Sequence, residues 1–157
     1  MKIALLLIGS TGEDYLKEGV TEYAKRIKNY AGFEEILIPE EKKWRKLSPD
    51  ERKRAEGEAL RKKLSSGDIL ILLDENGREF TSVGFADYLQ KKMNAGPKRL
   101  IFAVGGAFGF DEETYRIAQG KVALSQMTFS HQMVRLFALE QIYRAFTILN
   151  NEPYHNQ

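Results

Sequence analysis

The chain has 157 residues, of which 43% are hydrophobic and 29% are charged, and its formal net charge is +2. This length predicts one domain, residues 1–157, whose core needs no crosslinks. Because cysteine is absent and only two histidines occur, disulfides, thiolate metal sites and a cysteine nucleophile are excluded, and no ligand spacing points to a metal. The apolar run at residues 3–8 is too short to span a membrane, so we expect a cytoplasmic protein without a membrane partner.

Strands and helices are expected to alternate along the chain. Continuous runs of branched apolar residues are typical of strands covered on both faces, and apolar residues three and four apart are typical of helices. In chain order these patterns predict a strand at 2–8, a helix from 11 or 12 to 31, a strand at 33–39, a helix at 49–64, a strand at 68–73, a helix at 82–93, a strand at 99–104, a helix from 111, a strand from 122 and a helix at 131–150. Five alternations predict an α/β fold with a mainly parallel sheet and helices on both faces.

Short motifs mark three of the boundaries between these elements. Ser10 precedes Glu13 by three residues, which is the spacing of a capping box at the start of the first helix. The run at residues 48–51, Ser-Pro-Asp-Glu, has the same spacing and a proline at the first helical position. The dipeptide Asn-Gly predicts a turn over residues 74–78, directly after the third strand.

Positive charge is concentrated between Lys42 and Lys63, where ten Lys or Arg residues stand against four acidic ones. Such a block forms either a solvated helix face or a surface that binds the phosphate backbone of a nucleic acid. Trp44 lies in this block between two cations. Its ring either folds back on the domain or offers a platform on which a base stacks.

Two strand ends indicate a ligand pocket. In an open parallel sheet, ligands bind at the carboxyl ends of the strands. Residues 105–109, which are rich in glycine, follow the fourth strand, and residues 124–129 follow the fifth, so we expect them to form two walls of one pocket. The adjacent carboxylates Asp74 and Glu75 follow the third strand and serve either this pocket or the turn.

The residues of these walls favour a carried cofactor over a phosphate. The glycine spacing matches neither the dinucleotide fingerprint nor a P-loop, and the acids at 111–113 oppose a phosphate at the start of the next helix. No serine or histidine stands in a pattern typical of hydrolysis. We therefore expect a ligand that is held by backbone amides and apolar walls and that supplies its own reactivity.

The expected closing helix, residues 131–150, carries apolar residues around nearly its whole circumference. A helix with this pattern is buried on all sides. The sheet of one small domain covers only part of such a surface, so we expect a second copy of the chain to cover the rest, as a homodimer.

A family resemblance rests on four segments: Ile101–Gly109, Leu124–His131, Leu139–Ala145 and Pro153-Tyr154-His155. Together they resemble the RlmH family, small SPOUT-class methyltransferases of bacteria, and the resemblance extends over the whole chain. It implies transfer of a methyl group from S-adenosyl-L-methionine to ring N3 of a pseudouridine in large-subunit (23S) ribosomal RNA, on the assembled ribosome. It also implies a homodimer with its active site at the subunit boundary and a C-terminal trefoil knot, which is a rare exception to unknotted topology.

The resemblance implies two sets of functional residues. The loops of the knot would bind the cofactor through Leu73, Gly105, Gly106, Leu124, Ser125, Gln126, Met127, Thr128 and Phe129. Arg144 would face an RNA phosphate or the base carbonyls, although its spacing also suits an ion pair with Glu140, four residues earlier. Tyr154 and His155 would stack on or hydrogen-bond the target base and help to remove its ring proton.

The last two residues depart from the family, in which a charged pair often follows the Tyr-His. Here Asn156 and Gln157 stand at these positions, which shifts the expected phosphate contacts to Arg144, Arg135 and the basic block.

Two other functions stay open at this point. One is a methyltransferase of the same fold that acts on another RNA, such as transfer RNA; such relatives usually carry an added RNA-binding domain, and none is visible here. The other is a non-catalytic basic module that binds the ribosome, which would have no need for Tyr154 and His155.

Overall fold

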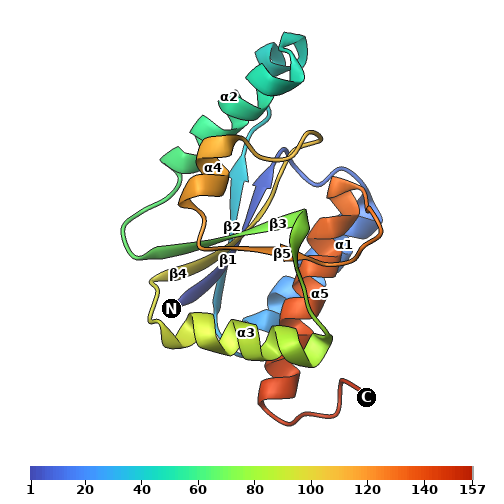
Figure 1. Ribbon diagram of the computed structural model, residues 1–157. Coiled ribbons are helices and arrows are strands. Elements are labelled where there is room, and N and C mark those ends of the chain that lie inside the picture. The colour runs from blue at the N-terminus through green and yellow to red at the C-terminus, as the bar shows by residue number, and fades with distance from the viewer. Residues whose placement is uncertain (157) are drawn as a thin grey trace.

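The computed structural model describes residues 1–156, which form a five-stranded sheet flanked by helices (Figure 1). In chain order the elements are β1 (Lys2–Ile8), α1 (Asp14–Ile27), β2 (Gly32–Ile38), the 3-10 helix η1 (Lys42–Lys46), α2 (Pro49–Lys62), β3 (Asp68–Glu79), α3 (Ser82–Asn94), β4 (Arg99–Val104), α4 (Glu112–Ile117), β5 (Gly120–Ala123) and α5 (His131–Leu149). The strand order is β2-β1-β4-β3-β5, and each neighbouring pair is parallel. The predicted α/β fold with a parallel sheet is confirmed, whereas the knot stays a prediction.

Both faces of the sheet are covered by helices. Ile3 and Leu5 of β1 pack on one face together with residues of α1, α3 and α5. Ala4 and Leu6, which alternate with them, pack on the other face together with residues of η1, α2 and α4. Since a fully buried leucine or isoleucine stabilises the fold by about 1.5–3 kcal/mol, two-sided burial explains why these strands are apolar throughout.

Arg135 of α5 attaches that helix to the end of β1. Its side chain is 1% exposed, and its guanidinium donates to the carbonyl oxygens of Ile8 and Gly9, each at 2.9 Å, and to Thr11 Oγ1 at 3.1 Å. Burial lowers the pKa of this guanidinium from its ordinary value. The expectation that Arg135 contacts RNA phosphate is therefore wrong, because the residue is enclosed in the fold.

The two predicted capping boxes have different outcomes. At the start of α2, Ser48 Oγ accepts from the Glu51 backbone N–H and Glu51 Oε1 accepts from the Ser48 backbone N–H, each at 3.3 Å, as predicted. The box at Ser10 is wrong, because Glu13 is the N-cap of α1 and makes no side-chain capping bond. The segment before α1 is instead bound by Arg135, so the helix begins after it.

The segment between β2 and α2 contains η1. Trp44 at its centre is 4% exposed and belongs to the core cluster beneath α2. The interpretation that this ring folds back on the domain is confirmed, and a base-stacking platform at Trp44 is excluded.

The predicted turn at 74–78 is a bulge within β3 rather than the end of the strand. Leu73 and Arg78 both stand opposite Val122 of β5, so the four residues between them loop out of the ladder. A Cβ atom on Gly77 would lie 2.7 Å from backbone atoms of Lys121 and Val122. Two backbones therefore touch at Gly77, and only glycine permits this approach.

Replacing Gly77 with alanine should lower the free energy of unfolding by about 1–3 kcal/mol, because neither backbone can move without displacing the sheet. Urea unfolding measures the change. Gly12→Ala is the matched control: its added Cβ would lie 3.9 Å from the Gln132 side chain, and we expect a change below about 0.5 kcal/mol. Equal stability of the two variants would contradict the proposed backbone contact.

Candidate active site

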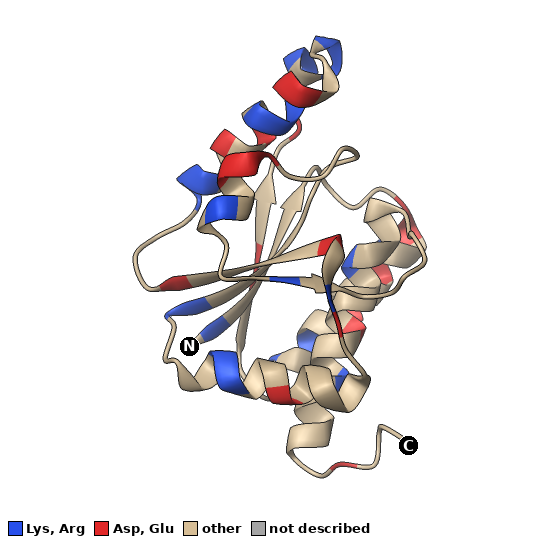
Figure 2. Ribbon diagram, in the orientation of Figure 1, with Lys and Arg blue, Asp and Glu red and all other residues tan. Residues whose placement is uncertain are grey.

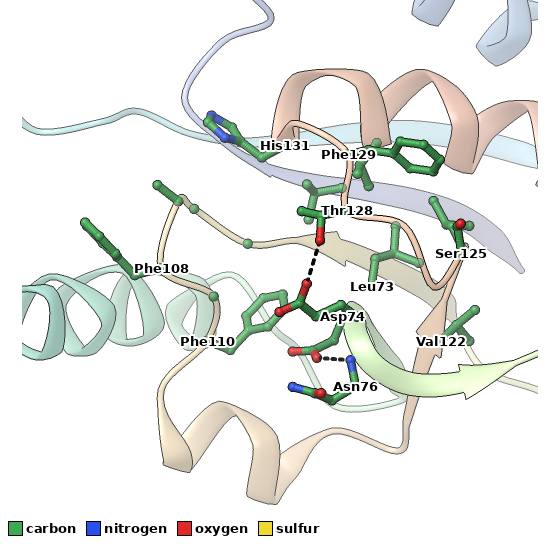
Figure 3. Close-up of a pocket in the computed structure, with 18 of the residues that line it drawn as sticks. Leu73, Asp74, Asn76, Phe108, Phe110, Val122, Ser125, Thr128, Phe129 and His131 are labelled. Atoms are coloured by element: carbon green, nitrogen blue, oxygen red, sulfur yellow. Dashed lines mark hydrogen bonds between the residues drawn. The ribbon is translucent and has the colours of Figure 1, made fainter.

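A cavity of about 380 Å³ lies where the carboxyl ends of β3, β4 and β5 meet (Figure 3). Its walls are the bulge of β3, the glycine-rich loop after β4 and the loop after β5. The lining includes eight of the nine residues expected to bind a cofactor, namely Leu73, Gly105, Gly106, Leu124, Ser125, Met127, Thr128 and Phe129. The two strand ends predicted to form one pocket therefore do so.

Neighbouring side chains pack closely against two glycines of the glycine-rich loop. A Cβ on Gly105 would lie 3.2 Å from the Phe110 ring, and a Cβ on Gly106 would lie 2.6 Å from Glu56 Oε1. Gly109 has a φ of +84°, in the left-handed region that favours glycine. These glycines let the backbone itself form the cavity wall.

Glu56 of α2 supports this loop from the side away from the cavity. Its side chain is 2% exposed; Oε2 forms an ion pair with Arg52 at 3.2 Å, while Oε1 has no hydrogen-bond partner among the described residues. Burial raises the pKa of this carboxyl, and the bond from Arg52 only partly opposes the rise.

The loop after β5 is joined to the bulge of β3 across the mouth of the cavity. Thr128 Oγ1 donates to Glu75 Oε2 at 3.2 Å, and Gln126 Nε2 donates to Glu79 Oε2 at 3.2 Å. Gln126 is thus the one expected cofactor residue that does not line the cavity. Met127, between the two, is 76% exposed.

Tyr115, which the sequence did not mark as a site residue, joins Asp74 and Glu75 in the lining of the cavity. Tyr115 of α4 donates to Asp74 Oδ2, and Asp74 Oδ1 accepts from the Asn76 backbone N–H at 2.8 Å. Burial and the bond to Asp74 raise the pKa of Tyr115 to about 12. Asp74 and Glu75 both line the cavity and both shape the bulge, so the two alternatives left open for them coexist. Their position directly after a strand was the only signal in the sequence.

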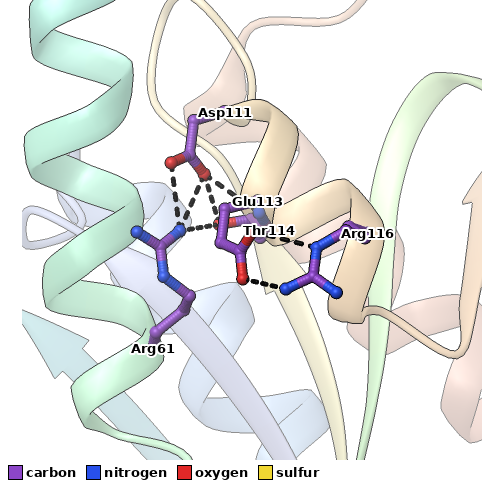
Figure 4. Close-up of polar contacts among 5 residues, drawn as sticks. All are labelled: Arg61, Asp111, Glu113, Thr114 and Arg116. Carbon is purple, nitrogen blue, oxygen red and sulfur yellow. Dashed lines mark hydrogen bonds and ion pairs between the residues drawn. The ribbon is translucent and has the colours of Figure 1, made fainter.

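Helix α4 is held beside the cavity by α2 (Figure 4). Arg61 Nη1 donates to both Asp111 carboxylate oxygens at 3.0 Å and to Thr114 Oγ1 at 2.9 Å. Asp111 is the N-cap of α4, which begins at Glu112, one residue after the predicted start. Burial alone would raise the pKa of Asp111, but the bonds from Thr114 and Arg61 outweigh it and lower the pKa.

The three residues expected to contact substrate lie together at the other end of α5. Arg144 Nη2 donates to Glu140 Oε1 at 2.6 Å, Tyr154 OH donates to the same oxygen at 3.1 Å, and Arg144 Nη1 bonds His155 Nδ1 at 3.0 Å. Tyr23 of α1 completes the group, with its hydroxyl 3.2 Å from that of Tyr154. We call these five residues the C-terminal cluster.

Hydrogen-bond chemistry assigns the protons in the C-terminal cluster. Arginine only donates, so Nδ1 of His155 accepts and the proton of the neutral ring lies on Nε2. Tyr154 gives its one proton to Glu140, so Tyr23 donates to Tyr154. Burial, the bond with Tyr23 and the nearby Glu140 carboxylate raise the pKa of Tyr154, which keeps its hydroxyl protonated.

The C-terminal cluster and the cavity are far apart within one chain. His131, at the start of α5, lines the cavity, and Arg144 lies about 20 Å further along the helix axis at about 1.5 Å per residue. The two sets of predicted residues are therefore each brought together, but not with one another.

Within residues 1–156, no group of three or more His, Asp or Glu side chains is placed to hold a metal ion. No helix in the same range is both long and apolar enough to cross a membrane.

Comparison with known proteins agrees with this geometry. Residues 1–155 match a family model described as "Predicted SPOUT methyltransferase". Proteins named "Ribosomal RNA large subunit methyltransferase H" from Flavobacterium johnsoniae and Parabacteroides distasonis are 55% and 54% identical to this chain over 157 residues, which is 100% of each chain. A protein of the same name from Cytophaga hutchinsonii is 54% identical over 156 residues, covering 99% of this chain and 100% of its own.

A solved structure supports the fold. It is titled as a probable methylase family protein from Haemophilus influenzae and superposes with a TM-score of 0.52 at 14% sequence identity, over 95% of this chain and 66% of that chain. The family match spans nearly the whole sequence, and the full-length relatives share about half of its residues. The chain therefore belongs to the SPOUT methyltransferase family, in the group that includes the ribosomal RNA large subunit methyltransferase H proteins.

Proposed function

We propose that this protein transfers a methyl group from S-adenosyl-L-methionine to ring N3 of a pseudouridine in large-subunit ribosomal RNA, on the assembled ribosome. The proposal rests on 54–55% identity over the full length with relatives that are named as methyltransferases of large-subunit ribosomal RNA. We infer that the protein recognises a large surface that the assembled ribosome presents.

The cavity fits the proposed methyl donor in size and in chemistry. Its volume of about 380 Å³ lies in the usual range for small-molecule sites. Leu73, Val122 and Leu124 supply apolar walls, and the glycine-rich loop offers backbone groups at close range. The carboxylates of Asp74 and Glu75 suit the positive charge that the donor carries.

When bound, S-adenosyl-L-methionine supplies a methyl group that is already activated by a sulfonium. The residues of this chain then have to align the acceptor nitrogen with that methyl, at about 3–3.5 Å, and exclude water. Leu73, Leu124 and the backbone of the glycine-rich loop would hold this donor, which would supply the methyl carbon to N3 with cleavage of its bond to sulfur, while N3 would release its proton to solvent.

The C-terminal cluster supplies donors toward the base. N3 lies between two carbonyl groups of the ring, and loss of its proton spreads negative charge onto their oxygens. The Arg144 guanidinium and Nε2–H of His155 stabilise that charge, as preorganised donors do in other enzymes. Since Tyr154 stays protonated and Nδ1 of His155 is occupied by Arg144, the cluster acts by stabilising the deprotonated base rather than by removing the proton.

A homodimer would bring the two sites together. The cavity and the C-terminal cluster lie at opposite ends of α5, so one protomer cannot place a base between them. A two-fold dimer in which the cluster of one protomer meets the cavity of its partner forms two complete sites. Apolar side chains that stay partly exposed near the cavity, such as Phe108 at 47% and Phe129 at 37%, support such an interface.

Calorimetry with S-adenosyl-L-methionine tests the cofactor assignment. The unmodified protein should bind, and Gly106→Ala should bind at least about tenfold more weakly, because its Cβ meets the buried Glu56 carboxylate and displaces the cavity wall. Gly12→Ala, whose added Cβ would lie 3.9 Å from the Gln132 side chain and which does not line the cavity, should bind normally. The proposed function fails if the unmodified protein does not bind this donor, or if mass spectrometry finds no methyl group on large-subunit RNA after reaction.

Mixing two inactive variants tests the composite site. Gly106→Ala impairs the cavity and Arg144→Ala impairs the C-terminal cluster. In a randomly mixed population, half of the dimers contain one of each, and each mixed dimer has one site with both parts intact, so activity should recover to about one quarter of the unmodified level. Absence of recovery, with mixed dimers verified by mass spectrometry, would show that the site lies within one protomer.

Tyr154→Phe tests the bonds within the C-terminal cluster. Removing this hydroxyl leaves Glu140 and Tyr23 without their shared partner and loosens Arg144, so kcat/KM should fall about tenfold to a hundredfold with donor binding unchanged. Tyr15→Phe removes a hydroxyl that is exposed to solvent and should leave both quantities unchanged. Equal activity of the two variants would contradict the role given to the cluster.

A further inference from the structure

The Lys and Arg residues of the basic block gather along η1 and α2 (Figure 2), and they differ in whether they form ion pairs. Four cations of α2 form ion pairs: Arg52 with Glu40 and Glu56, Lys53 with Asp50, Arg61 with Asp111, and Lys62 with Glu58. Among the described residues, Lys42, Arg45 and Lys46 of η1 form no ion pair, and all three are exposed. We call these three residues the basic turn.

Trp44 anchors the backbone of the basic turn to the core. The Trp44 indole packs in the core, while the cations that precede and follow it in the sequence are exposed to solvent. The backbone of η1 therefore lies against the core. The turn is closed by the bonds from Trp44 N to Glu41 O and from Leu47 N to Trp44 O, each 3.1 Å. Because the backbone that carries these cations is already ordered, less conformational entropy is lost when they bind an anion.

A groove of about 650 Å³ runs beside the basic turn, between the end of β2 and α2. Its apolar floor is formed by Ile38, Trp44, Leu47, Ala55 and Ala59. Lys43, Lys62 and Lys63 also line it, together with Glu41 and Glu58, which form ion pairs with Lys43 and Lys62. Among the described residues, Lys63 and the three cations of the basic turn therefore supply the unpaired positive charge at this concave surface, which suits a polyanion such as a nucleic-acid backbone.

The basic turn is connected to the rim of the methyl-donor cavity. Glu40, just before η1, pairs with Arg52 of α2 at 2.5 Å. The Arg52 guanidinium lies 5.9 Å from the ring centre of Phe108, which lines the cavity. A chain of contacts therefore leads from the cavity to the basic turn on the same side of the sheet.

We propose that the basic turn and the adjoining groove bind the sugar–phosphate backbone of the RNA that flanks the target base. The inference rests on the proposed function and adds a second contact surface, separate from the cavity and from the C-terminal cluster. It contacts backbone rather than base edges, so it contributes affinity and orientation but no sequence preference.

Replacement of Lys42, Arg45 and Lys46 by glutamine tests the surface, with purified large ribosomal subunits or assembled ribosomes as the probe. Each lost phosphate contact reduces the salt dependence of binding by about 0.7–0.9, so the slope of log K against log salt should become shallower by about 2. The dissociation constant at about 0.1 M salt should rise roughly a hundredfold. Donor binding, measured by calorimetry, should be unchanged.

The matched control replaces Lys2, Lys91 and Lys98 by glutamine. These lysines are exposed at the opposite, amino end of the sheet, and the change in net charge is the same. The control should keep the original slope and affinity. The proposal is overturned if the basic-turn variant binds as tightly as the unmodified protein, or if both triple variants weaken equally.

The two proposals fail in different ways. If the unmodified protein does not transfer methyl groups to ribosomal RNA, the proposed function is wrong whatever the basic turn does. If it transfers them and the basic-turn variant keeps its affinity, its salt slope and its KM for the ribosome, only the surface assigned here is wrong.

Discussion

The contact of two backbones at Gly77 is the constraint on which the cavity depends. It places the bulge of β3 against β5, so the loops that follow both strands meet at one edge of the sheet. The bonds from Thr128 to Glu75 and from Gln126 to Glu79 then join these loops across the opening. A side chain at Gly77 would separate the strands and with them the walls of the cavity, so local steric exclusion determines the shape of the site.

The position of α5 connects stability to function. Arg135 attaches its first turns to the end of β1, near the cavity, while Glu140 and Arg144 organise the C-terminal cluster further along the same helix. A single rigid helix therefore holds two functional groups at a set separation of about 20 Å. That separation makes a symmetric partner part of the proposed catalytic site rather than an addition to it.

Paired and unpaired cations lie at different ends of the basic block. Arg52 forms an ion pair with Glu56 beside the glycine-rich loop, and Arg61 forms one with Asp111 at the start of α4. These pairs neutralise charges in places where an unpaired buried charge would be costly. Among the described residues, Lys42, Arg45 and Lys46 of η1, which face solvent, have no ion-pair partner. The same stretch of sequence thus serves the fold at one end and is available to an anionic partner at the other.

The sequence by itself determined the order of strands and helices, the parallel sheet and the meeting of residues 105–109 with residues 124–129, because each depends on local hydrophobic patterns and on where parallel strands end. It did not reveal the bulge at Gly77, which was predicted as a turn, because an Asn-Gly pair has the same local preference in both settings. From the sequence, Arg135 was expected to contact RNA, and the Trp44 ring could have been exposed. Both are buried because segments distant in the sequence pack around them. The distance between cavity and C-terminal cluster likewise follows from the straight course of α5 through the fold, which no spacing along the chain expresses.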